Sequence, residues 1–264
     1  MPRTLSPAAR IERSILSDFR KPLWRPFVRG IKQYKMIAPG DHIAVCISGG
    51  KDSMLLAKMM QLLQRHTDIP FETEFLVMDP GYNAENRQRI IDNAALMEIP
   101  IRIFDSSIFE TTKIAERNPC YLCARMRRGF LYDRAQEMGC NKIALGHHYD
   151  DVVETFMMNL FNEGRIGCFS PKSYLSRKDL WMIRPLVFAP EKEVRKAAAK
   201  CGLPIVKSKC PADGHTSRQQ MKEFLLQHEK DSDGFKYRLF GALRRSGIDG
   251  WGYTGKSARQ KVDK

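Results

Sequence analysis

The chain has 264 residues, 43% of them hydrophobic, so it is long enough for one large α/β core and too short for several independent domains. No stretch approaches the roughly 20 uninterrupted apolar residues of a membrane-spanning helix, and the charged amino-terminal residues lack the apolar core of a secretory signal. We therefore expect a soluble protein of the reducing cytoplasm, without a membrane partner. Seven unevenly spaced cysteines then suggest metal ligands or reactive thiols rather than a disulfide framework.

The formal net charge of +14 is concentrated at the amino-terminal end. Residues 1–40 contain nine Lys or Arg residues but only two acids, Glu12 and Asp18. The aromatic residues Phe19, Trp24 and Phe27 lie among these cations. Cations interspersed with aromatic residues favour a polyanionic partner such as a nucleic acid. The alternative is a solvated amphipathic helix without a ligand.

The hydrophobic spacing predicts one or two helices over residues 6–35, interrupted near Pro22 and Pro26. Strands and helices then alternate. The expected strands are 42–48, 71–79, 100–105, 142–147 and 181–188, and the expected helices between them are 53–65, 83–97, 124–138 and 150–162. This alternation predicts an α/β fold with a doubly wound, mainly parallel sheet of about five strands, whose ligand site lies at the carboxyl ends of the strands.

The chain divides into four predicted regions: a basic helical extension (1–40), the α/β domain (41–205), a helical subregion (206–250) and a basic tail (251–264). Within the α/β domain, a polar and basic loop is expected at 164–180 and a helix at 190–202. Two more helices are expected in the third region, at 216–229 and 234–246.

A glycine pair follows the first predicted strand. Gly49 and Gly50 lack a Cβ, so the backbone can turn sharply and aim N–H groups at an anion. The loop is not a Walker A motif. That motif requires a glycine where this chain has Val45, and Ser or Thr where this chain has Asp52. A strand, Ser-Gly-Gly-Lys-Asp-Ser at 48–53 and a helix instead resemble the pyrophosphate loop of the N-type ATP pyrophosphatases, which cleave ATP between its α and β phosphates. A plain turn is the alternative.

Cys120 and Cys123 form a second motif, because two thiolates three residues apart can bind one metal centre as a helix begins. Cys210 is the candidate third ligand. Three cysteines would hold an iron–sulfur cluster with one open iron. The alternatives are a structural zinc site that includes His215 and a thioredoxin-like redox pair, although the latter should follow the first strand. The remaining thiols are expected to be buried or incidental: Cys46, Cys140, Cys168 and Cys201.

Six candidate site residues lie where the fourth predicted strand ends and the next helix begins: Gly146, His147, His148, Asp150, Asp151 and Glu154. Two acids at a strand's carboxyl end can hold Mg²⁺ or order a catalytic water, and the alternative is capping of the helix. His147 or His148 is expected to contact a phosphate, or only to pack against neighbouring side chains. Asp79 ends the second strand and is a candidate for ribose or adenine contact, or for capping the Pro80-Gly81 turn.

Three cations follow the cysteine pair on one predicted helix: Arg125, Arg127 and Arg128. Like charges beside a metal centre are costly unless an anion lies nearby. They are expected to bind nucleic-acid phosphate, to neutralise a negatively charged cluster or to stabilise an adenylate. An exposed basic helix face is the alternative.

With these motifs, residues 20–245 resemble the TtcA family of tRNA 2-thiocytidine synthetases, in the TtcA/TtuA group of cluster-dependent tRNA thiolases. The resemblance rests on residues 48–53, 120–129, 142–151 and 184–186 and on Cys210. It implies a PP-loop fold like that of the adenine nucleotide alpha hydrolases, a [4Fe-4S] cluster on Cys120, Cys123 and Cys210, and the use of ATP and Mg²⁺. It also implies thiolation of cytidine 32 of tRNA by a homodimer that receives sulfur from a cysteine desulfurase or from free sulfide.

The resemblance also implies roles for single residues. The ATP site comprises Ser48, Gly49, Gly50, Lys51, Asp52, Ser53, Asp79, Gly146 and His147, and the catalytic residues are Lys51, Asp52, Asp151 and Arg127. The C2 oxygen of the base attacks the α-phosphate, while Lys51 and a Mg²⁺ ion on Asp52 and Asp151 neutralise charge. Sulfide then displaces AMP.

Three alternative functions stay open at this point. A lysidine synthetase shares the loop but has no use for three metal-binding thiols. A 2-thiouridine synthetase of the TtuA type shares the cluster but usually carries terminal zinc knuckles, which this sequence lacks. A non-catalytic RNA-binding protein would leave the pyrophosphate loop unexplained. The chain departs from the family beside Cys210, where many members have a further cysteine and this sequence continues with Pro211-Ala-Asp-Gly.

Overall fold

The computed structural model describes residues 5–109, 119–203 and 217–252. Within them, one six-stranded sheet has the order β3-β2-β1-β4-β6-β5. The strands are β1 (Asp41–Ile47), β2 (Phe71–Asp79), β3 (Ile101–Asp105), β4 (Lys142–Ala144), β5 (Lys172–Leu175) and β6 (Leu180–Ile183). Every neighbouring pair is parallel except β5 with β6. The doubly wound, mainly parallel α/β fold is confirmed.

The predicted count of five strands is wrong, because β5 lies inside the segment expected to be a loop. Its four residues pair antiparallel with β6, so that Tyr174 lies opposite Trp181. The strand is short, carries a lysine and occupies the edge of the sheet. Such edge strands lack the continuous apolar run by which buried strands are recognised.

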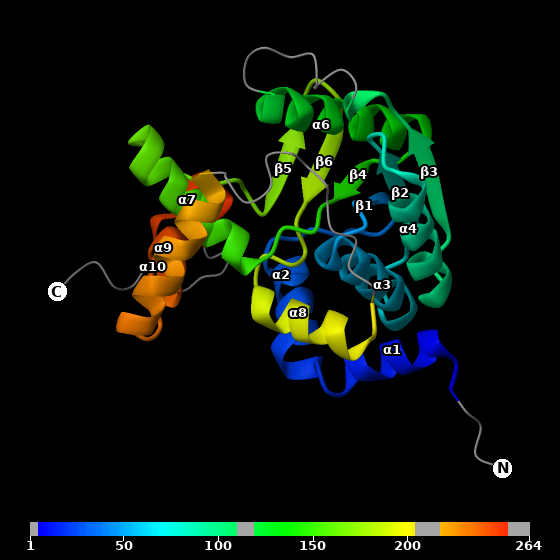
Figure 1. The fold of residues 1–264 in the computed structure, drawn as a ribbon, viewed down its shortest axis with the longest axis horizontal. Coiled ribbons are helices and arrows are strands. Elements are labelled where there is room, and N and C mark those ends of the chain that lie inside the picture. Colours follow the sequence, from blue (N-terminus) through cyan, green and yellow to red (C-terminus); the bar gives the residue numbers. More distant parts are fainter. Residues whose placement is uncertain (1–4, 110–118, 204–216, 253–264) are drawn as a thin grey trace.

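Helices cover both faces of the sheet (Figure 1). Four of the helices follow β1, β2, β3 and β6 along the chain: α3 (Lys51–His66), α4 (Ala84–Leu96), α6 (Pro119–Glu137) and α8 (Glu191–Lys200). Alternate β1 side chains face opposite layers: Ile43, Val45 and Ile47 belong to the main core with α3, whereas Ala44 and Cys46 pack on the α6 side.

The amino-terminal extension packs on the main core. It consists of α1 (Pro7–Leu16), the π-helix η1 (Arg20–Trp24) and α2 (Arg25–Gln33). The break between the helices lies at residues 17–19, before the predicted position, because Pro22 lies inside η1 and Pro26 lies in the first turn of α2. Its apolar side chains join the α3 core: Ile11, Ile15, Leu23 and Phe27. The fully buried Lys58 of α3 pairs with Glu12 of α1, with Nζ 2.6 Å from the carboxylate. The extension is therefore held against α3 by its buried apolar side chains and by the ion pair between Glu12 and Lys58.

A second helical group stands beside the β5 and β6 edge, at the left of Figure 1. It contains α7 (Tyr149–Glu163), α9 (Ser217–Asp231), α10 (Phe235–Ser246) and the 3₁₀ turn η2 (Ile248–Gly250). The tail predicted from residue 251 is wrong for Trp251, which is fully buried and whose Nε1 donates to the Phe169 carbonyl at 2.9 Å. Among the described helices, none combines the length and apolarity that crossing a bilayer requires.

Candidate functional site

The order of the strands places a crevice between β1 and β4. β2 and β3 extend from one side of β1, whereas β4, β6 and β5 extend from the other, so chain connections leave in opposite directions at this point. Ligands of open α/β sheets bind at the carboxyl ends of the strands beside such a reversal. The loop after β1 and the segment after β4 both lie there.

Hydroxyl contacts fix the loop after β1. Ser53 Oγ accepts from the Ser48 N–H at 3.1 Å and donates to the Gly50 carbonyl at 3.0 Å. Gly49 has a φ of +79°, a left-handed conformation that favours glycine. A Cβ on Gly146 would lie 3.2 Å from the Ser53 nitrogen, so the segment after β4 packs tightly against the start of α3.

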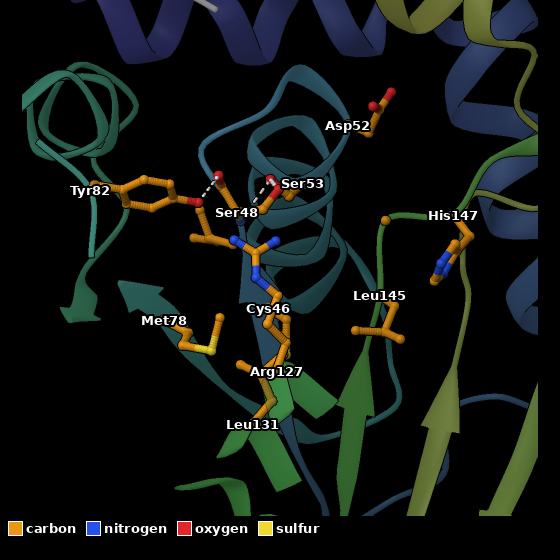
Figure 2. A pocket seen from close by; sticks show the side chains of 12 residues that line it. Cys46, Ser48, Asp52, Ser53, Met78, Tyr82, Arg127, Leu131, Leu145 and His147 are labelled. Carbon is orange, nitrogen blue, oxygen red and sulfur yellow. Dashed lines mark hydrogen bonds between the residues drawn. The ribbon is translucent and has the colours of Figure 1, made fainter. Parts of the chain in front are cut away.

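A cavity of about 260 Å³ opens beside this loop (Figure 2). Six of its lining residues were predicted site residues: Ser48, Asp52, Ser53, Arg127, Gly146 and His147. The others supply mainly apolar walls: Cys46, Ile47, Met78, Tyr82, Leu131 and Leu145. No chemical signal in the sequence marks these walls, since strand and helix side chains of this kind also fill ordinary cores.

Arg127 enters the cavity from α6, and Figure 2 shows its guanidinium directed toward Ser48 and Tyr82. Its Nε is buried and has no hydrogen-bond partner in the described part of the chain. The Tyr82 hydroxyl donates to the Ser48 carbonyl at 3.2 Å. Arg127 is therefore a half-buried cation facing the loop, suited to an anionic ligand. Arg125 and Arg128 are exposed.

The cysteine pair begins the helix that carries Arg127. Cys123 is half-buried, and the i, i+4 spacing places it on the same helix face as Arg127. Burial raises the pKa of Tyr82 and Arg127 opposes this shift, while Asp79 and Cys123 raise the pKa further. Cys123 itself does not line the cavity. For Cys120 only the helical backbone is described, and Cys210 and His215 lie outside the described residues.

The other four cysteines match the expectation of single packed thiols. Cys46, Cys140 and Cys168 are buried and Cys201 is half-buried. Burial raises the pKa of each thiol, to about 11 for Cys140 and about 12 for Cys168. Thiols of this kind stay protonated and are poor metal ligands.

Lys51 does not line the cavity but binds two carboxylates. Its Nζ lies 3.1 Å from Asp52 and 3.2 Å from Glu191 at the start of α8. Burial opposes charge on Lys51, but the two carboxylates raise its pKa. Although burial would raise the pKa of Glu191, Lys222 and Lys51 hold it well below its usual value. Sequence reasoning missed Glu191, because an acid in the first turn of a helix is common.

His148 separates the two predicted magnesium ligands. Its Nε2 lies 3.7 Å from Asp52, and its Nδ1 lies 3.3 Å from Asp151. Asp151 also accepts the His148 backbone N–H, which completes a capping box at the start of α7. Asp150 faces away and binds Lys236 and the Glu191 N–H. The capping that sequence reasoning held as an alternative is thus present at Asp151.

Arg218 of α9 contacts the acids of α7. Its Nη1 lies 3.4 Å from Asp151 and 3.2 Å from the buried Glu154. Burial and Asp151 raise the pKa of Glu154. Within the described ranges, no group of three or more His, Cys, Asp or Glu side chains is arranged to hold a metal ion.

Asp79 caps a turn. Its Oδ1 accepts the N–H groups of Gly81 and Tyr82, at 2.9 and 2.6 Å, and its Oδ2 pairs with Arg87 at 2.7 Å. It does not line the cavity. Of the two roles considered for Asp79, the structure supports capping, which positions Tyr82 at the cavity wall.

His147 lies between the cavity and a buried arginine. Its ring packs on Phe169, with centroids 5.0 Å apart, and the Arg184 guanidinium lies 4.7 Å from the centroid of the same ring. His147 Nδ1 is buried without a hydrogen-bond partner among the described residues. Burial, with Arg184 nearby, lowers the pKa of His147 to about 4, so the imidazole is neutral at pH 7.

Comparison with known proteins agrees with this geometry. Residues 25–229 match the model of the PP-loop domain. Two curated tRNA-cytidine(32) 2-sulfurtransferases are similar to this chain. The protein from Alkalilimnicola ehrlichii is 35% identical over 81% of this chain and 69% of its own length. The protein from Pelobacter propionicus is 34% identical over 81% of this chain and 82% of its own length.

A solved structure has a similar fold. The U34-tRNA thiolase NcsA from Methanococcus maripaludis, with its [4Fe-4S] cluster, superposes with a TM-score of 0.68. The superposition covers 84% of this chain and 78% of NcsA, at 23% sequence identity. At this identity the comparison establishes the shared architecture.

Proposed function

We propose that this chain, which belongs to the PP-loop family of tRNA-cytidine(32) 2-sulfurtransferases, uses ATP to replace the C2 oxygen of cytidine 32 in tRNA with sulfur. The observation that carries the proposal is one shared cavity. The loop of residues 48–53 forms one side of it, and the helix that carries Cys123 and Arg127 forms another. Activation by ATP and delivery of sulfur would thus meet at a single base.

The residues of the loop suit adenylation. The C2 oxygen attacks the α-phosphorus of ATP, the bond to the β-phosphate breaks, and pyrophosphate leaves into the loop of residues 48–53. Arg127 faces the cavity without a carboxylate partner in the described structure and would stabilise the charge that develops. His147 is neutral and offers a hydrogen bond without adding positive charge. Sulfide then bonds to C2, and the C2–O bond breaks as AMP leaves.

The described residues fit the implied groups in part. Asp52 Oδ1 is buried and accepts no hydrogen bond from the described residues, so it is a suitable acceptor for Mg²⁺ or its water. Asp151 would join it only if Arg218 and His148, which contact its two carboxylate oxygens, moved away. Cys123 would hold a [4Fe-4S] cluster with Cys120 and Cys210, which would present sulfide at an open iron. Sulfur from a cysteine desulfurase or free sulfide, and a homodimer, belong to the same proposal.

Reconstitution tests the proposal. Anaerobically prepared protein is incubated with ATP, Mg²⁺, sulfide and an unmodified tRNA transcript, and the nucleosides are analysed by mass spectrometry. We expect 2-thiocytidine from a transcript with cytidine at position 32 and none when that position holds uridine. Formation of 2-thiouridine or lysidine instead would assign the chain to another PP-loop activity.

A further inference from the structure

A groove of about 450 Å³ is lined by residues of η1 and α2. These elements belong to the amino-terminal extension and lie beside α8 (Figure 1). Four exposed cations surround the indole of Trp24 in this groove: Arg20, Arg25, Arg29 and Lys32. No residue of the nucleotide cavity belongs to it. The groove is therefore a second concave surface with its own chemistry.

The positive charge of the groove is not compensated. None of the four cations forms an ion pair with a carboxylate in the described chain. Both acids of the extension are engaged elsewhere: Glu12 with Lys58 and Arg65, and Asp18 with Lys200. Cations on other helices, such as Arg89 and Lys196, are paired within their own helix. An uncompensated cluster of this kind is suited to a polyanion.

Trp24 gives the groove an aromatic surface. It ends the π-helix, where its N–H bonds the Phe19 carbonyl at 3.0 Å, and π-helical turns often occur at functional sites. The Phe27 ring supports the indole from behind, with centroids 5.4 Å apart, and Trp24 is only partly buried. A supported indole among cations can stack a nucleobase whose neighbouring phosphates are bound.

The groove connects with the nucleotide site through one segment. The Arg29 guanidinium lies 4.5 Å from the centroid of Phe188, and Arg244 of α10 lies 5.0 Å from the same centroid. Three residues after Phe188, Glu191 binds Lys51 beside the loop of residues 48–53. RNA held in the groove would thus lie against the segment that helps to position the ATP site.

We infer that this groove binds an unpaired stretch of the tRNA substrate, with one base stacked on Trp24 and the adjacent phosphates on Arg25 and Arg29. The inference rests on the proposed function, because an RNA substrate is what would bring such a strand to the protein. A duplex offers phosphates but no free base face, so a duplex would use the cations without the indole.

The test compares two fluorescently labelled probes, a short single-stranded RNA and an RNA duplex with the same number of phosphates. Their affinities for the full chain are measured by anisotropy across a salt series. Trp24→Leu keeps an apolar contact with Phe27 and should weaken single-stranded binding by at least about fivefold while leaving duplex binding unchanged. Arg25→Gln with Arg29→Gln should flatten the slope of log affinity against log salt by roughly one unit per lost contact.

Matched controls separate the groove from general effects of charge and aromatic content. Arg89→Gln with Arg102→Gln removes the same charge from two exposed, ion-paired arginines, and Trp181→Leu removes another partly exposed indole. Both controls should bind as the wild type does. Wild-type affinity of Trp24→Leu for the single strand, or an equal loss for both probes, would overturn the inference.

The same series distinguishes this inference from the proposed function. If the wild type thiolates cytidine 32 but Trp24→Leu binds the single strand normally, the proposed function stands and the inference about the groove fails. If the wild type makes no 2-thiocytidine but Trp24→Leu loses single-strand binding, the inference about the groove stands and the proposed function fails.

Discussion

Ser53 and Asp52 are adjacent but serve the loop differently. The Ser53 hydroxyl ties Ser48 to Gly50, whereas one oxygen of Asp52 binds Lys51 and the other has no hydrogen bond in the described structure. Because these contacts shape the loop, Asp52→Ala and Ser53→Ala should each slow conversion of ATP to AMP and pyrophosphate by about a hundredfold. Product analysis with labelled ATP measures this.

Both variants should keep wild-type affinity for tRNA, since neither residue lies in the groove of η1 and α2. Asp92→Ala, which removes a carboxylate from the exposed face of α4, is the matched control and should retain full turnover. Release of ADP and phosphate by the wild type would contradict adenylation.

His147 predicts a pH dependence of stability. Its pKa falls from 6.5 to about 4 on folding because of burial and the nearby Arg184, with Arg218 and His148 acting in the same direction and Asp151 opposing. Between these values the unfolded chain binds more protons than the folded chain, so the free energy of unfolding decreases as the pH falls.

Compared with His147→Gln, the wild type should therefore lose about 3 kcal/mol of stability between pH 7 and pH 4. Urea denaturation of both proteins at several pH values gives the difference. Parallel stability curves for the two proteins would show that His147 is not held neutral by its surroundings.

At the scale of elements, one buried lysine joins three helical segments. Lys58 of α3 binds Glu12 of α1, the Gln61 side chain and the Met97 carbonyl at the end of α4. Glu12→Gln leaves a buried cation without its carboxylate and should reduce the free energy of unfolding by about 1–3 kcal/mol.

The double variant Glu12→Gln with Lys58→Met removes the cation as well and should recover part of this loss, because a buried apolar chain needs no partner. Glu85→Gln, at an exposed pair on α4, is the control and should change stability by less than about 0.5 kcal/mol. Equal destabilisation by Glu12→Gln and Glu85→Gln would contradict the role of Lys58.

The elements also show what the sequence could and could not predict. Helices α3 and α7 and strands β1 and β2 follow strong apolar patterns, and the structure contains them close to the predicted bounds. Strand β5 was missed because it depends on pairing with β6, and Trp251 was placed in a tail because its burial depends on Phe169 and Tyr34. These features depend on contacts between distant segments, which local propensity does not encode.

The residues of the candidate site also fall into two groups: those that a local sequence motif predicts and those that only the packing of distant helices brings to the site. Residues that belong to a local motif, such as Ser48 and Arg127, lie at the cavity, and their roles in ATP binding and catalysis stay predictions. Glu191 and Arg218 reach the site from α8 and α9, and their roles arise only from the packing of those helices. Asp79 shows the converse case, in which a residue at a strand end supports a turn beside the cavity.

At the scale of the whole molecule, the three cysteines predict a visible cofactor. Anaerobically purified protein should be brown and contain about four irons per chain, because three thiolates fit a cubane with one open iron. Cys123→Ser should lose the iron, whereas Cys201→Ser, which alters a half-buried thiol after α8, should retain it. Metal analysis with visible absorption measures both. Stoichiometric zinc without iron would support the structural zinc site instead.

The central claim is that one chain joins a pyrophosphate loop to a thiol site in order to thiolate cytidine in tRNA. Mass spectrometry of tRNA nucleosides from cells that lack this chain tests it most directly. We expect 2-thiocytidine to disappear and to return with the wild-type chain but not with Asp52→Ala or Cys123→Ser. Unchanged 2-thiocytidine in those cells, or loss of a thiouridine or of lysidine in its place, would contradict the account.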